Sequence, residues 1–126
     1  MLNRLLANAH VTRAFRVLFV AAMVLAVVLA LLPAVDDPFA NLWDKLKHAL
    51  TFGVLVGLAA FGWRQTPLLR IGERLSFLGA LIEVFQSIPA LHRDCDPKDW
   101  LADTLAIAVA LIIIKATGLR DDRPQI

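Results

Sequence analysis

Acidic, basic and amide side chains gather in three separate stretches of this sequence, each beside a long apolar run. Carboxylates and imidazoles serve proteins as general acids, general bases and metal ligands. Lysine and arginine bind anionic groups through charge-assisted hydrogen bonds. These stretches are therefore the candidate functional site. Their members are Asp44, Lys45 and His48 in the first stretch, Glu83 and Gln86 in the second, and Arg93, Asp96, Asp99 and Asp103 in the third.

The spacing within the first two stretches predicts that their polar residues share helix faces. Lys45 and His48 are three residues apart, and Glu83 and Gln86 have the same separation, which places each pair on one face of a helix. Glu83 also precedes Pro89 by six residues, so it lies about 9 Å from the end of a helix that stops there. A charged group at such depth in a membrane costs about 2.5–3.5 kcal/mol and usually faces a partner or a water-filled cavity. An alternative is that Glu83 and Gln86 only hold helices together.

The third stretch contains a helix start. Asp96 followed by Pro97 predicts an N-cap residue and the first helical position. Asp99 then falls in the first turn, where the helix dipole favours acids. Asp103 lies one turn deeper and continues the acidic stripe, and Arg93 is the expected counter-charge.

The elements that must position these residues are apolar helices. Hydrophobic residues make up 59% of the 126 residues and charged residues only 19%, and the excess is concentrated in four runs, which is typical of a multi-pass membrane protein. We expect an all-α fold, a membrane-embedded four-helix bundle that forms a single domain over residues 1–126. The predicted spans are approximately residues 15–33, 48–63, 71–88 and 100–115. In the second span, Gly53 and Gly57 form a small-xxx-small pair that predicts close approach of another helix.

The basic residues predict the orientation, because cytoplasmic segments of membrane proteins are enriched in lysine and arginine. Four of the 13 lie in the first and third connections. The remaining nine fall in the two terminal segments and the second connection, so we expect both termini to be cytoplasmic. This distribution explains the basic charge without nucleic acid, and we expect no nucleic-acid partner. The nine are Arg4, Arg13, Arg16, Arg64, Arg70, Arg74, Lys115, Arg120 and Arg123.

Together the three stretches resemble the VanZ-like family over roughly residues 36–110. They read Asp44-Lys45-x-x-His48, Glu83-x-x-Gln86 and Arg93-x-x-Asp96-x-x-Asp99-x-x-x-Asp103. The family consists of small bacterial integral membrane proteins, so the resemblance implies a multi-pass protein of the bacterial cytoplasmic (inner) membrane. Its founding member is associated with resistance to teicoplanin-type glycopeptides, which act on cell-wall precursors outside the membrane. Asp103 and Ala106 stand where the family usually has asparagine and glycine.

Three functional hypotheses follow, and they leave open whether the protein is an enzyme. In the first, an outward-facing polar pocket between the second, third and fourth helices binds or acts on a ligand of the cell envelope. Within this pocket, Lys45, His48, Gln86 and Arg93 contact an anionic or glycosylated lipid-linked molecule, such as a cell-wall precursor or a glycopeptide-related ligand, and the acids orient them. The second is metal-dependent chemistry, for which oxygen and imidazole donors are present but no ligand-spacing motif. The third is a structural or partner-binding role in the lipid bilayer, with the polar layer as interhelical glue.

Overall fold

The computed structural model describes residues 1–31, 40–88 and 97–120, and helix is the only regular secondary structure in these ranges. The described part of the chain contains five helices, so the all-α prediction is confirmed. They are α1 (Leu2–Leu6), α2 (Ala9–Leu31), α3 (Ala40–Gly62), α4 (Leu68–Gln86) and α5 (Pro97–Thr117). The four predicted spans correspond to α2 to α5, and the short α1 was not predicted.

Local sequence explains where the helices begin and end. Helix α4 begins directly after Pro67, and α5 begins at Pro97. Proline suits the start of a helix because its missing N–H would have no intrahelical partner there. Helix α5 ends before Gly118, whose φ of 64° is a left-handed conformation that favours glycine. Helices α2 and α3 start six and eight residues before the predicted spans, because their polar flanking segments are also helical.

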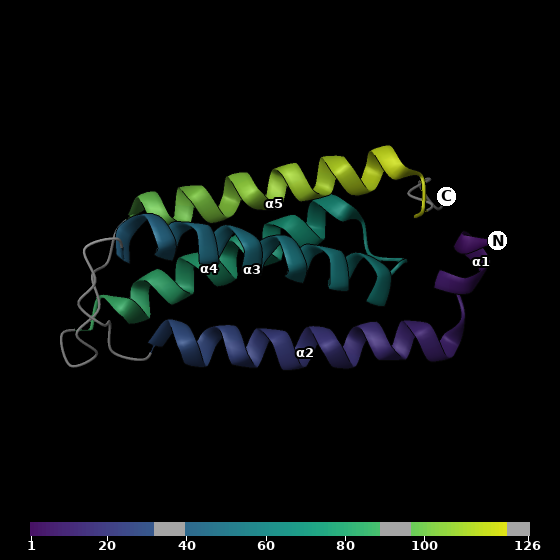
Figure 1. The fold of residues 1–126 in the computed structure, drawn as a ribbon, viewed down its shortest axis with the longest axis horizontal. Coiled ribbons are helices and arrows are strands. Elements are labelled where there is room, and N and C mark those ends of the chain that lie inside the picture. Colours follow the sequence, from purple (N-terminus) through teal and green to yellow (C-terminus); the bar gives the residue numbers. More distant parts are fainter. Residues whose placement is uncertain (32–39, 89–96, 121–126) are drawn as a thin grey trace.

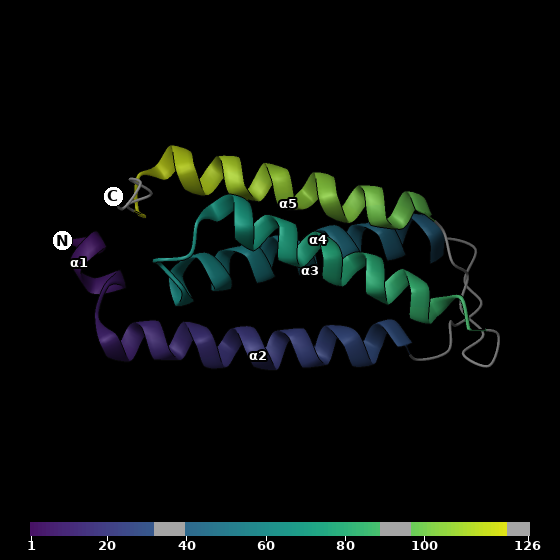
Figure 2. The same ribbon diagram turned by 180° about the vertical axis from the view of Figure 1, so that it is seen from behind.

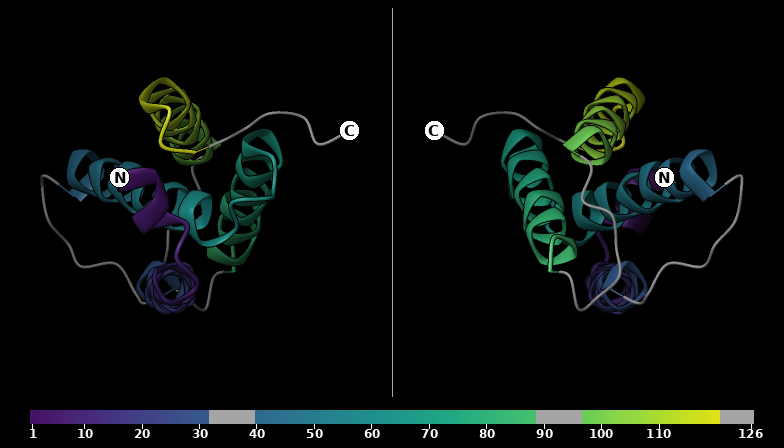
Figure 3. Two further views of the ribbon diagram at one scale, coloured as in Figure 1. Left: turned by 90° about the vertical axis from the view of Figure 1, so that its right-hand side faces the viewer. Right: turned by 90° about the vertical axis from the view of Figure 1, so that its left-hand side faces the viewer.

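The four long helices run side by side along the long axis of the molecule (Figure 1). The carboxyl ends of α2 and α4 and the amino ends of α3 and α5 lie together at one end. The opposite end holds α1, the turn from α3 to α4 and the end of α5. Seen end-on, α2 and α5 lie on opposite sides, with α3 and α4 between them (Figure 3), and α3 contacts each of the other three. Each pair of consecutive long helices is therefore antiparallel (Figure 2).

The apolar core is built mainly on α3. Five of its residues, Phe52, Leu55, Val56, Ala59 and Ala60, are almost fully buried. They pack with Ile71, Leu75 and Ile82 of α4 and Ile107 and Ile114 of α5. Helix α2 has no buried residue and packs against this core through one partly buried stripe that includes Phe19, Met23 and Val27. Its remaining apolar side chains are exposed, as expected where lipid replaces water.

Three helices are long and apolar enough to cross a membrane: α2, residues 45–62 of α3 and residues 98–117 of α5. Helix α4 is not among them because its 19 residues include four charged ones, Arg70, Glu73, Arg74 and Glu83. The protein therefore has the character of a multi-pass membrane protein.

The glycines at the helix contacts differ from those predicted. A Cβ built on Gly53 or Gly57 would meet no atom of the described residues within 4 Å, so this pair does not mediate a close helix contact and the prediction is wrong. Close approaches occur instead at Gly62, the last residue of α3, where a Cβ would lie 3.2 Å from Arg16 Cγ, and on α4. There, a Cβ on Gly72 would lie 2.6 Å from Leu111 Cδ1, and one on Gly79 would lie 3.4 Å from Asp103 Oδ2. The rotation of α3 turns Gly53 and Gly57 away from its neighbours, which the sequence spacing does not reveal.

Candidate functional site

His48 of α3 and Asp103 of α5 form the central contact of the candidate site. The Nδ1 atom of His48 lies 3.2 Å from Oδ1 and 3.4 Å from Oδ2 of Asp103. In the tautomer that carries the proton on Nδ1, His48 donates this hydrogen bond and the carboxylate accepts it. The side chains are 11% and 2% exposed, so the pair is buried between the two helices. A histidine in this contact keeps Nε2 for a second partner.

Helix α4 approaches this pair through a glycine. The Cα of Gly79 lies so near that an added Cβ would be 3.4 Å from Asp103 Oδ2 and 3.5 Å from Trp100 Cδ1. Phe52 of α3 closes the same space, with its Cζ atom 3.4 Å from that Cβ position. The histidine–aspartate contact is thus enclosed by three helices.

The register between α4 and α5 aligns the other acidic residues. Trp100 Nε1 donates to the carbonyl oxygen of Ser76 at 3.0 Å. Gly79, one turn after Ser76, faces Asp103. Because the helices are antiparallel, one further turn along α4 brings Glu83 level with Asp99, which lies one turn before Asp103. Glu83 and Asp99 are 6% and 7% exposed, so two buried carboxylates occupy the same level.

Gln86 connects the site to α2. Its Nε2 atom donates to the carbonyl oxygen of Ala30 at 2.8 Å, and the residue is 2% exposed. A free carbonyl is available there because the last four carbonyls of a helix have no intrahelical partner. The amide nitrogen of Gln86 thus caps the end of α2, a contact that the spacing of Glu83 and Gln86 did not predict.

The structure therefore places five of the described candidates at one end of the molecule, on α3, α4 and α5: His48, Glu83, Gln86, Asp99 and Asp103. Lys45 is half-buried in α3, one turn before His48. Asp44 belongs to α3, and its side chain is not among those that the structure describes. The remaining two candidates, Arg93 and Asp96, lie outside the described residues. Within the described ranges, no three histidine, cysteine or acidic residues are grouped closely enough to hold a metal ion.

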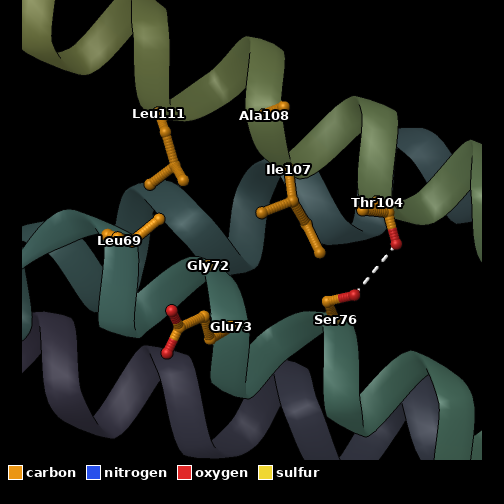
Figure 4. A pocket seen from close by; sticks show the side chains of 8 residues that line it. All are labelled: Leu69, Gly72, Glu73, Ser76, Thr104, Ile107, Ala108 and Leu111. Carbon is orange, nitrogen blue, oxygen red and sulfur yellow. Dashed lines mark hydrogen bonds between the residues drawn. The ribbon is translucent and has the colours of Figure 1, made fainter.

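The candidate residues line neither of two grooves on the described surface. One, of about 380 Å³, runs between α4 and α5 and is mainly apolar (Figure 4). Ser76 and Thr104 face each other there, with their hydroxyl oxygens 2.9 Å apart. Because the Thr104 hydroxyl donates to the carbonyl oxygen of Trp100, Ser76 is the donor of this contact. The second groove, of about 500 Å³, lies between α2, α3 and α4.

A polar cluster that the sequence did not predict lies at the opposite end, where three arginines donate to backbone carbonyls. Arg120 is 4% exposed and donates from Nη2 to the carbonyl oxygens of Arg64 at 2.8 Å and Trp63 at 3.3 Å. Arg64 in turn donates to the carbonyl oxygen of Leu119 at 3.1 Å, and Arg16 Nε donates to that of Gly62 at 2.6 Å. These contacts join α2 and the segment after α5 to the end of α3. The available signal was the set of free carbonyls that any helix end leaves for nearby cations.

No family model, curated protein or solved structure matches this chain. The resemblance to the VanZ-like family thus stays a prediction from three short motifs.

Proposed function

We propose that this chain is a VanZ-like multi-pass protein of the bacterial inner membrane that binds a lipid-linked cell-envelope ligand at its polar end. In this arrangement α2, α3, α4 and α5 all cross the bilayer as a four-helix bundle, and both termini are cytoplasmic. The charge distribution supports this orientation, because the end that carries α1 and the end of α5 also carries the excess of arginines. The polar cluster then opens toward the cell exterior.

The observation that carries the proposal is the burial of three carboxylates at one end of the helix assembly. Glu83, Asp99 and Asp103 are each at most 7% exposed and come from two adjacent helices. On insertion scales each such group costs about 2.5–3.5 kcal/mol at the centre of a membrane helix, and an apolar residue would avoid that cost. Ionisable residues retained at this level are a mark of function in membrane proteins.

The chemistry of these groups favours a ligand rich in hydroxyl groups. Carboxylates accept hydrogen bonds, and sugar hydroxyls donate them. His48 and Gln86 already donate to Asp103 and to Ala30, so among the candidate residues that are described, Lys45 remains as the cation for an anionic linkage. A glycosylated lipid-linked molecule offers both the sugar hydroxyls and the anionic linkage. The association of the founding VanZ-like protein with teicoplanin-type resistance is consistent with a ligand among cell-wall precursors.

A structural or partner-binding membrane protein is the second candidate, and the internal contacts favour it. His48–Asp103, Gln86–Ala30 and Ser76–Thr104 each join two helices and would stabilise the assembly without any ligand. In this case the polar layer is interhelical glue.

Replacement of Glu83 by glutamine distinguishes the two candidates. The change removes one charge and keeps the shape, and Glu73→Gln on the exposed part of the same helix is the matched control. We measure teicoplanin susceptibility of bacteria that express the full chain, together with its abundance in the membrane fraction. The binding proposal predicts that Glu83→Gln abolishes the effect of the protein at normal abundance, whereas Glu73→Gln retains it. Equal activity of both variants, or a loss that only follows abundance, contradicts it.

A further inference from the structure

The larger groove lies at the opposite end of the molecule from the candidate site. It is formed by α2, the end of α3 and residues 71–81 of α4, and its volume of about 500 Å³ is within the range of roughly 300–1,000 Å³ typical of ligand pockets. Phe19 and Met23 form its α2 side, and Leu78 and Leu81 form part of its α4 side. Leu81 is 38% exposed, so the groove is open to the surroundings of the helices.

One end of this groove has a fixed aromatic wall. The ring of Trp63 meets that of Phe19 edge-on, with the centroids 5.1 Å apart and an interplanar angle of 80°. The guanidinium carbon of Arg16 lies 5.6 Å from the Trp63 ring centroid, which is cation–π geometry. A tryptophan ring held between an aromatic and a cation is typical of the level where hydrocarbon meets headgroups.

The groove is apolar except at that same end. Arg74 is the one charged side chain among the described residues that line it, and it is exposed. It follows the start of α4 by six residues, or about 9 Å, so its side chain is long enough to extend toward the headgroup level. Thr66, in the turn after α3, adds a hydroxyl donor to the same lining.

We propose that this groove binds one anionic phospholipid, with an acyl chain along the apolar walls and the phosphate at Arg74. The occupant is a lipid because three helices are apolar enough to cross a bilayer, which makes acyl chains the neighbours of an open apolar groove. The lipid is anionic because the wall carries a cation and no acid, and basic pockets between membrane helices bind anionic headgroups. This site is separate from the carboxylate cluster and from its proposed ligand.

Lipid retention by the purified full-length protein tests this proposal. Native mass spectrometry in mild detergent counts the lipids bound after addition of phosphatidylglycerol or of phosphatidylcholine with the same acyl chains. We expect one retained phosphatidylglycerol and about fivefold weaker retention of phosphatidylcholine, since one arginine contact near the surface has about that effect. Arg74→Gln should remove the preference. Lys115→Gln, at an exposed position of α5, should keep it.

A second pair of variants tests the groove itself. Met23→Trp enlarges a side chain on its wall and should lower the retention of both lipids. Val24→Trp, at the neighbouring lipid-facing position that is 55% exposed, should change neither. Circular dichroism checks that each variant keeps the helical content. Equal retention of the two lipids by the unmodified protein overturns the proposal without any variant, as does an unchanged preference in Arg74→Gln or equal losses in both tryptophan variants.

Discussion

Removal of the His48 imidazole should lower the free energy of unfolding, and the size of the loss depends on how deeply the His48–Asp103 contact is buried. Hydrogen bonds between membrane helices contribute about 0.6 kcal/mol on average. Breaking a buried ion pair in a protein interior costs about 3–5 kcal/mol. The side chains of His48 and Asp103 are 11% and 2% exposed and meet at 3.2 Å, so this contact is closer to the buried limit. We therefore expect His48→Ala to lower the free energy of unfolding by about 2–3 kcal/mol.

A double-mutant cycle isolates the contact from other effects of the substitutions. His48→Ala, Asp103→Ala and the double variant are unfolded by denaturant in micelles, with circular dichroism at a helical wavelength as the measurement. The double variant should be more stable than the sum of the single losses predicts, by about 1–2 kcal/mol, since it leaves neither polar group alone in the core. Asp103→Asn keeps an acceptor oxygen for Nδ1–H and should lose less than Asp103→Ala.

Leu50→Ala provides the control, because Leu50 lies on the same helix and is 61% exposed. Its effect should stay within about 0.5 kcal/mol. Additive losses in the cycle, to within about 0.5 kcal/mol, would refute the reasoning. In that case the imidazole and the carboxylate would not stabilise each other.

Three further predictions concern packing, the arginine cluster and the orientation. Gly72→Ala should lower the unfolding free energy by about 1–2 kcal/mol, because its Cβ would lie 2.6 Å from a methyl group of Leu111. The control Gly53→Ala should change the unfolding free energy by less than about 1 kcal/mol, and thermal melts compare the two variants. Arg120→Ala should cost about 2 kcal/mol in the same assay through lost charge-assisted hydrogen bonds, while Lys115→Ala at an exposed site costs nothing measurable. Cys95, the single cysteine, should react with a membrane-impermeant maleimide from outside intact cells; labelling only after lysis would reverse the proposed orientation.

Local sequence was sufficient to predict most of the helices. Four apolar runs predicted α2, α3, α4 and α5, and proline predicted the start of α5 at Pro97. The same rules failed for the glycines of α3, since Gly53 and Gly57 face no neighbouring helix within the described residues. Periodicity shows which residues of a helix share a face, and it does not show which face meets a neighbour.

The candidate site was predicted as a set of residues, and the structure added the partners. The positions of Glu83, Gln86 and Asp103 along their helices already implied a common level. Spacing could not show that Gln86 donates to a backbone carbonyl of α2 or that His48 contacts the carboxylate of Asp103. The arginine contacts at the other end were missed for a related reason: their acceptors are backbone carbonyls, which every sequence has and no motif marks.

Composition and spacing alone determined that the chain forms apolar helices, where those helices meet charged segments, and which polar residues lie near their ends. These properties depend on backbone hydrogen bonding and on the transfer of side chains from water, and both act within one helix. The tertiary structure decided how each helix is rotated and in which register it meets its neighbours. It did so through close contacts such as those of Gly72 and Gly79, because side chains from segments far apart in the chain must fill the same space.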